Sequence, residues 1–196
     1  LPGVYSITVT PPEDVENAWG TLSTEALVGE DLTTMEALVV PPQVDLRGSV
    51  TTFRDEPAVG ATLDARARAH DDADGLHRSE ETVSNALGAF VMSMDSGLYD
   101  MHVKVPSASG FGWLVEPELI MDLDAGPVAR SYELVPPIPI DGVVTSADGL
   151  PVAGALLRAY VLSGSGSDAR QVEVAEAVSD ADGGYRLLIT PGLVVE

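Results

Sequence analysis

The sequence predicts an all-β protein made of tandem seven-stranded antiparallel Greek-key β-sandwiches. Three observations lead to this class. Apolar and polar residues alternate with a period of two, glycine and proline recur between the alternating segments, and the whole pattern repeats after about 94 residues. The 45% hydrophobic content is typical of a globular core, so the 19 glycines and 14 prolines indicate many turns rather than disorder.

The alternation is clearest in residues 99–105. Apolar side chains occupy one face (Tyr99, Met101, Val103, Val105) and polar ones the other (Asp100, His102, Lys104). Residues 5–9 and 185–189 show the same period. Residues 24–40 are the segment most compatible with a helix, but the β-branched residues at its end and the two prolines that follow it favour strands. About seven short strands per unit favour a two-sheet sandwich over a parallel α/β sheet.

Turn-forming residues separate the alternating segments. They lie at 54–57, 84–88, 147–151 and 180–184, and each group sits between two apolar-alternating runs. We therefore expect these four groups to be turns between strands.

Long stretches of the chain match one another. Residues 46–65 match 140–159 without a gap, 83–99 match 178–194 after a one-residue change in loop length, and 2–12 match 96–106. Trp19 and Trp113 also recur at the repeat distance. Glycine and proline recurring at a fixed offset predict that the same turns recur.

The repeat divides the chain into three parts. Residues 1–42 form the closing half of a β-sandwich repeat, 43–136 a complete repeat, and 137–196 the opening portion of a further repeat. Two arrangements follow: the chain is part of a longer array, or its opening portion and closing half pair as a circularly permuted domain. The second predicts backbone pairing between the segments around Leu187 and Ile7.

Charge is the most unusual bulk property. The chain has 31 Asp and Glu against 10 Lys and Arg, a net charge of −21. Such a chain repels phosphate backbones and anionic lipids, so we expect no nucleic-acid partner and no membrane insertion. No apolar run is long enough to span a bilayer, and the first residues do not look like a signal peptide, so we expect the sequence to begin after any targeting segment. With no cysteine, disulfides and thiolate metal sites are excluded.

Two motifs resemble a known family. The segments 142–155 (GVVTSADGLPVAGA) and 179–192 (SDADGGYRLLITPG) are similar to carboxypeptidase regulatory-like domains, within the transthyretin-like and collagen-adhesin B-type group. The complete repeat matches less closely, because Leu87 and Phe90 replace the usual Asp and Tyr. The resemblance implies seven-stranded transthyretin-like (prealbumin-like) sandwiches that act as accessory, spacer or adhesion modules of exported proteins.

Some adhesin relatives carry an isopeptide bond between Lys and Asn beside an acidic residue. Lys104 is the only lysine here, and Asn17 and Asn85 are the only asparagines. Lys104 lies on the polar face of a late strand and Asn85 in a turn, so we expect no such bond.

The carboxylates and histidines offer two candidate cation sites. His77 and Glu80 have the spacing of a zinc carboxypeptidase motif, and His70 and Glu81 are the further ligands available to it. These residues fall in a long polar loop, so we expect no catalytic zinc site. The better cation candidate is a calcium loop whose carboxylates are Asp71, Asp72 and Asp74. It lacks the remaining ligands of a full calcium loop, so we expect no required cofactor. His102 is expected at the surface.

Trp19 and Trp113 are the candidates for ligand binding. Each tryptophan has two possible roles: its ring packs against the protein and anchors its loop, or its ring is exposed and stacks against a sugar. Exposure of Trp113 in the 106–115 loop would distinguish them.

No catalytic constellation is present, which predicts a non-enzymatic protein. The first hypothesis is a structural or interaction module of an exported multi-repeat protein, extracellular or at the cell surface. Its partners would be other repeats of the same or a neighbouring chain, joined by strand addition. The alternatives are a carbohydrate- or protein-binding adhesin-like module, and an accessory domain of a larger secreted peptidase.

Overall fold

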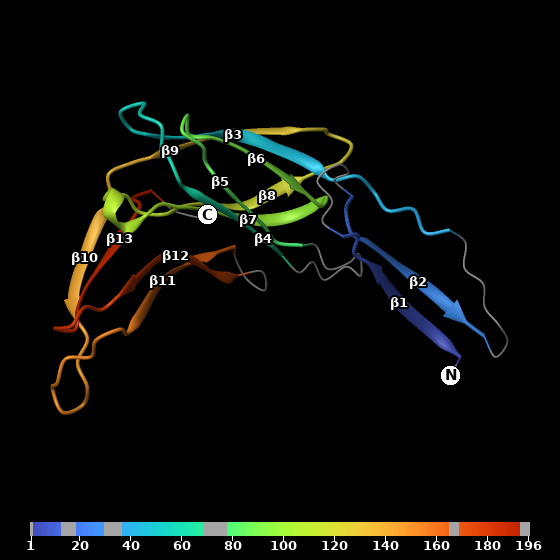
Figure 1. Ribbon diagram of the computed structural model, residues 1–196. Helices are drawn as coiled ribbons and strands as arrows, with labels where there is room; N and C mark the ends of the chain where they lie inside the picture. Colours follow the sequence, from blue (N-terminus) through green and yellow to red (C-terminus); the bar gives the residue numbers. More distant parts are fainter. Residues whose placement is uncertain (1, 13–18, 30–36, 69–77, 165–168, 193–196) are drawn as a thin grey trace.

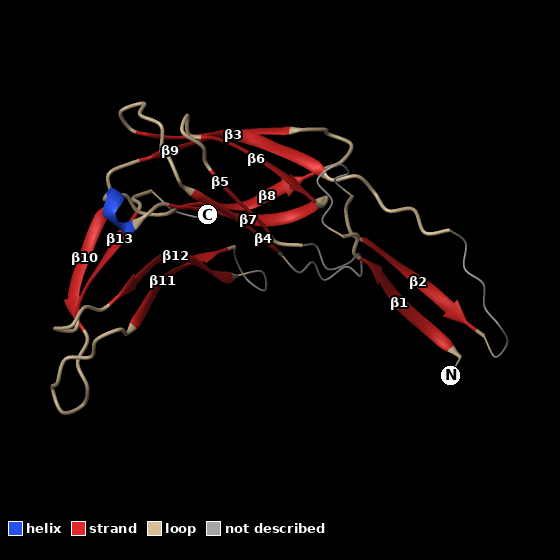
Figure 2. Cartoon of the chain, viewed as in Figure 1, coloured by secondary structure: helices blue, strands red, loops and turns tan. Residues whose placement is uncertain are grey.

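The computed structural model describes residues 2–12, 19–29, 37–68, 78–164 and 169–192. Within them the chain is all β, apart from one turn of 3-10 helix at Ser107–Ser109 (Figure 2). The strands are β1 (Gly3–Val9), β2 (Leu22–Val28), β3 (Val44–Thr52), β4 (Thr62–Ala67), β5 (Glu80–Val83), β6 (Ala89–Met94), β7 (Gly97–Lys104), β8 (Leu114–Met121), β9 (Val128–Leu134), β10 (Ile138–Val143), β11 (Leu156–Ser163), β12 (Arg170–Val178) and β13 (Gly184–Ile189). No described helix is long and apolar enough to cross a membrane.

Strands β3 to β9 form a seven-stranded β-sandwich. One sheet has the order β6-β3-β9 and the other β5-β4-β7-β8, and the two lie over each other in Figure 1. Their facing side chains make one core, in which Leu46, Leu63, Tyr99 and Met101 are fully buried. The predicted face of 99–105 is therefore confirmed as a core face.

One strand pair departs from the predicted antiparallel pattern. β3 pairs with β6 antiparallel but with β9 parallel, in a register from Leu46 opposite Val128 to Thr52 opposite Leu134. β9 follows β8 of the other sheet and crosses to lie beside β3 in the same direction. The first and last strands of the sandwich are thus direct neighbours.

The sequence repeat is also a structural repeat. Before the turn at 84–88, Ser84 Oγ donates to Ala58 O (2.6 Å) and accepts from Ala61 N (2.9 Å). Ser179, at the corresponding position, donates to Val152 O (2.6 Å) and accepts from Ala155 N (2.9 Å). Asn85 and Asp180 then accept backbone hydrogen bonds within their turns. The matching glycines and prolines do build matching turns.

The opening portion repeats only part of the sandwich. β10 pairs with β13 as β3 pairs with β6, and β11 pairs with β12 as β4 pairs with β5. β1 and β2 form a separate hairpin. Ile7 faces Thr24 and Leu187 faces Ile140, so the pairing expected between Ile7 and Leu187 in a permuted domain does not occur. In Figure 1 the hairpin β11-β12 lies beneath the sandwich, whereas the hairpin β1-β2 extends beyond its right end.

Candidate functional site: the joints between repeats

Trp113 lies where the complete repeat meets the opening portion. Thr190 follows β13 and donates from Oγ1 to the Trp113 carbonyl at 2.6 Å, while Lys104 Nζ lies 5.0 Å from the centroid of the Trp113 ring. Gly112 permits this approach, because a Cβ there would be 2.7 Å from the Leu188 carbonyl oxygen. The tryptophan is half-buried and its loop is held by the following strand.

Trp19 lies at the corresponding joint between the closing half and the complete repeat. Its loop is held by Asp95, which follows β6 as Thr190 follows β13. Asp95 is buried and accepts from Thr21 N (3.1 Å), and Arg78 Nη2 donates to the Trp19 carbonyl (3.0 Å). Burial alone would raise the pKa of Asp95, but hydrogen bonds, including those from Thr21, hold it below 3.8.

The two joints are built alike: the tryptophan loop of one repeat is hydrogen-bonded to the residue that follows the β6-type strand of the next repeat. This agrees with the packing interpretation of both tryptophans. Trp19 is nevertheless 44% exposed and Trp113 partly so, and ligand binding by either residue stays a prediction.

The second contact between repeats involves the outer face of sheet β5-β4-β7-β8. The hairpin β11-β12 of the opening portion lies against this face (Figure 1). Val115 of β8 packs with Val172 and Val174 of β12. Ala159 and Val161 of β11 and Ile189 of β13 pack against these three valines. The face of β7 that carries Asp100, His102 and Lys104, which the alternation predicts to be exposed, is therefore covered by this hairpin.

Because the hairpin β11-β12 packs on this face, the prediction made for His102 is wrong. His102 was expected at the surface but is 2% exposed, and neither ring nitrogen has a hydrogen-bond partner among the described residues. Desolvation lowers the pKa of His102 below 6.5, and the positive charges of Arg66 and Lys104 lower it further. The carboxylates of Asp64 and Asp100 act in the opposite direction but do not cancel this shift. His102 is therefore neutral at pH 7.

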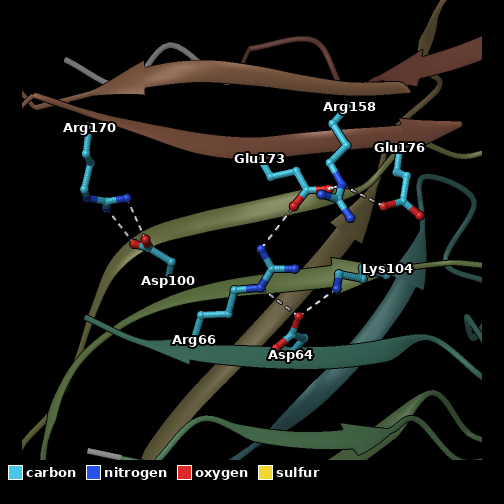
Figure 3. Close-up of polar contacts among 8 residues, drawn as sticks. All are labelled: Asp64, Arg66, Asp100, Lys104, Arg158, Arg170, Glu173 and Glu176. Atoms are coloured by element: carbon cyan, nitrogen blue, oxygen red, sulfur yellow. Dashed lines mark hydrogen bonds and ion pairs between the residues drawn. The ribbon is translucent and has the colours of Figure 1, made fainter. Parts of the chain in front are cut away.

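The charged residues near His102 form ion pairs that cross the joint, and Figure 3 shows these pairs. Arg170 of β12 donates two hydrogen bonds to Asp100 of β7, both at 2.6 Å. Arg66 of β4 bridges Asp64 on its own strand (3.0 Å) and Glu173 on β12 (3.2 Å). Two pairs connect the repeats, and each places a cation of one repeat against a carboxylate of the other.

Further charges extend this network within each repeat. Lys104 Nζ lies 2.6 Å from Asp64, and Arg158 contacts Glu173 (3.4 Å) and Glu176 (3.2 Å). Burial would raise the pKa of Asp64, but the hydrogen bonds and charges of Lys104 and Arg66 hold it below 3.8. Four of the chain's ten Lys and Arg residues gather here. In a chain with only ten Lys and Arg residues, this concentration of cations is the signal of the joint in the sequence.

A cleft of about 710 Å³ opens beside the Trp113 joint. Trp113 and Val105 line it from the complete repeat, and Tyr185 and Arg186 line it from the opening portion. Arg186 is paired with Asp141 at 2.6 Å, so the wall combines aromatic faces with exposed charge.

The cation candidates fall largely outside the described residues. This applies to Asp71, Asp72 and Asp74 of the calcium loop, and to His70 and His77. In the described ranges no three His, Asp or Glu residues are grouped to hold a metal ion. Asn17 is also outside them, whereas Lys104 is paired with Asp64 and Asn85 caps its turn.

No protein-family model and no curated protein matches the sequence. Solved structures similar to this chain include a Streptococcal ancillary pilin, with a TM-score of 0.36 and 12% identity over 96% of this chain and 63% of the pilin. They also include a shaft pilin from Lactobacillus rhamnosus GG (TM-score 0.32, 14% identity, 78% and 84% coverage) and the Bacillus anthracis TIE protein (0.34, 12%, 90% and 33%). The chain thus spans less than two thirds of the ancillary pilin.

Proposed function

We propose that the chain is a non-catalytic structural module of an exported multi-repeat protein, which spaces surfaces and carries tension in an extracellular assembly. The observation that carries this proposal is the parallel pairing of β3 and β9, the first and last strands of the complete sandwich.

Parallel end strands resist a pull along the chain. Tension through the repeat draws β3 from its first residue, Val44, and β9 from its last, Leu134, which lie at opposite ends of the paired strands. The two strands must then slide past each other, so all their hydrogen bonds bear the load together. An antiparallel pair pulled from one end opens one bond at a time. The arrangement suits a repeat that transmits force.

The joints support the same role. The hydrogen bonds at Trp19 and Trp113 and the pairs Arg170 with Asp100 and Arg66 with Glu173 fix each repeat against the next. Fixed joints keep the two ends of a repeat array at a set distance. A spacer needs this property, whereas a pair of freely linked domains lacks it.

Single-molecule force spectroscopy tests the proposal. The chain has no cysteine, so handles attach only at introduced ones. Val39→Cys with Pro136→Cys loads β3 and β9 in shear. Arg54→Cys with Leu87→Cys, at adjacent ends of β3 and β6, peels that antiparallel pair as a matched control. We expect a rupture force at least about twofold higher in shear, because forced unfolding follows the unfolding barrier. Equal forces would remove the load-bearing role.

A second candidate function rests on the cleft beside Trp113. Aromatic side chains next to paired charges suit a carbohydrate or a short peptide, as in adhesin-like modules. Titration with oligosaccharides, read out by tryptophan fluorescence, tests it. A response lost in Trp113→Leu and kept in Trp19→Leu would support binding, and no response to any ligand would leave Trp113 as a packing residue.

A further inference from the structure

His102 lies at the contact between the two repeats. On β7 it is opposite Val115 of β8, which packs with Val172 and Val174 of β12. The imidazole is buried, and neither ring nitrogen has a hydrogen-bond partner among the described residues. A buried polar group without a partner costs free energy, and the cost is larger when the group carries a charge. The joint therefore accommodates the neutral imidazole but disfavours the imidazolium.

The charges around His102 are already balanced. Four basic and four acidic side chains from β4, β7, β11 and β12 lie together in Figure 3, and each is in an ion pair with another of them. They are Asp64, Arg66, Asp100, Lys104, Arg158, Arg170, Glu173 and Glu176. Two further carboxylates border this set: Glu81 of β5 is exposed opposite Asp64, and Glu118 of β8 is paired with Arg68. A proton on His102 thus adds a positive charge to a set that has no unpaired carboxylate to receive it.

Side chains hold the hairpin β11-β12 on this face. The contact is formed by the valine cluster around Val115 and by the ion pairs of Arg170 with Asp100 and of Arg66 with Glu173. No backbone ladder joins β12 to β7 or β8 among the described strands, whereas ladders join β11 to β12 and β4 to β7. Local opening occurs where few buried contacts hold a segment. The hairpin can therefore leave the face while the sheets on both sides keep their hydrogen bonds.

We propose that this joint is opened by acid: uptake of a proton by His102 releases the hairpin β11-β12 from the face of β4, β7 and β8, while both repeats stay folded. In the open joint water solvates the imidazolium, so protonation favours the open state. The hydrogen bond from Thr190 to Trp113 and residues 135–137, between β9 and β10, then connect the two repeats. The fixed joint becomes a movable one, and the distance that the chain spans is no longer set.

The pH range follows from the proton affinity of His102 in the two states. In the closed joint, desolvation and the charges of Arg66 and Lys104 lower its pKa. In the open joint its pKa returns to about 6.5. The ratio of open to closed joints is therefore constant well above this pH and rises as the pH falls below it. Between about pH 7.5 and pH 5 the rise is at most about thirtyfold, because one proton changes the ratio by at most about tenfold per pH unit. Asp64, whose pKa is below 3.8, stays ionised in this range.

Thiol labelling of buried cysteines measures the opening, because a cysteine at the joint reacts only when the hairpin has left the face. The chain has no cysteine of its own. Val174→Cys places the thiol in the valine cluster, and Leu162→Cys on β11 is the matched exposed reference, whose rate corrects for the effect of pH on the reaction. Val103→Cys in the core of the sandwich reports unfolding of the complete repeat. A pyridyl disulfide serves as the reagent throughout.

From about pH 7.5 to pH 5 we expect the labelling rate of Val174→Cys, relative to Leu162→Cys, to rise by between about threefold and about thirtyfold. His102→Met should abolish this rise. His102→Gln should do the same, and it replaces the methionine variant if that variant does not fold. A relative rate that stays constant with pH overturns the proposal, and so does an equal rise in the His102 variants.

The opening must also be separate from unfolding. We expect Val174→Cys to react at least about tenfold faster than Val103→Cys at pH 5. Equal rates overturn the proposal, because the joint would then open only when the complete repeat unfolds. The force measurement of the proposed function loads β3 and β9 at neutral pH and does not involve this hairpin. The proposed function and this inference can therefore fail separately.

Discussion

Arg170 of β12 holds both carboxylate oxygens of Asp100 of β7, with two hydrogen bonds of 2.6 Å. Both side chains are mostly covered, Asp100 more than Arg170. A bidentate pair of this kind fixes orientation as well as distance. It therefore sets how the opening portion lies on the complete repeat.

Removing Arg170 leaves a mostly buried carboxylate without its cation. We expect Arg170→Met to lower the free energy of unfolding by about 1 to 3 kcal/mol, less than for a fully buried pair because the arginine is partly exposed. Asp100→Asn in the same protein should recover part of this loss. Urea unfolding of the four proteins of this cycle measures the coupling. A coupling near zero would show that the pair does not stabilise the joint.

His102 makes stability depend on pH. Its pKa in the folded chain lies below 6.5, so the unfolded chain binds the proton first as pH falls. The stabilisation is complete above pH 6.5 and is lost as the pH falls from there through the lowered pKa, with a slope of at most about 1.4 kcal/mol per pH unit for one proton.

Denaturant unfolding between pH 7.5 and 5 measures this slope. This window lies above the range in which Asp64 and Asp95, whose pKa values are below 3.8, take up protons. We expect His102→Met to flatten the profile. An unchanged slope in His102→Met would mean that the buried imidazole is not the source.

Gly48 and Gly142 occupy the same place in the repeat but have different surroundings. A Cβ at Gly48 would lie 1.8 Å from the Arg130 carbonyl oxygen of β9, whereas at Gly142 it would meet the Tyr185 side chain at 2.5 Å. A ring can move and a paired strand cannot. We expect Gly48→Ala to cost about 3 kcal/mol or more and Gly142→Ala about 1 kcal/mol. Equal stability losses would contradict the strand placement.

Calcium should not be required for folding. The melting temperature should be the same in calcium and in magnesium at equal ionic strength, because both ions then screen the net charge of −21 alike. A rise specific to calcium that disappears in Asp72→Asn would instead establish the loop of Asp71, Asp72 and Asp74 as a calcium site.

Local patterns predicted most of the fold. Alternation in 99–105 identified the core face of β7, and the recurring turns brought Ser84 and Ser179 into identical hydrogen bonds. These features depend on neighbouring residues, so a single sequence records them. The recurrence of Trp19 and Trp113 likewise pointed to a repeated packing role.

Features that depend on distant segments were missed. The direction of β9 beside β3 depends on a crossing between sheets that alternation does not encode. His102 looks like a surface residue because its neighbours are Met101 and Val103. It is buried only because a hairpin about seventy residues further along covers its face. Complementary charges, such as Arg170 and Asp100, are a trace of this joint in the sequence.

Single-molecule force spectroscopy of the Val39→Cys/Pro136→Cys protein is the most direct test of whether the pair β3 and β9 bears load. We predict a rupture force at least about twofold higher than that of the Arg54→Cys/Leu87→Cys protein, because the first geometry shears all the hydrogen bonds of the parallel pair together and the second peels β3 from β6. Equal rupture forces in the two proteins would contradict the load-bearing role.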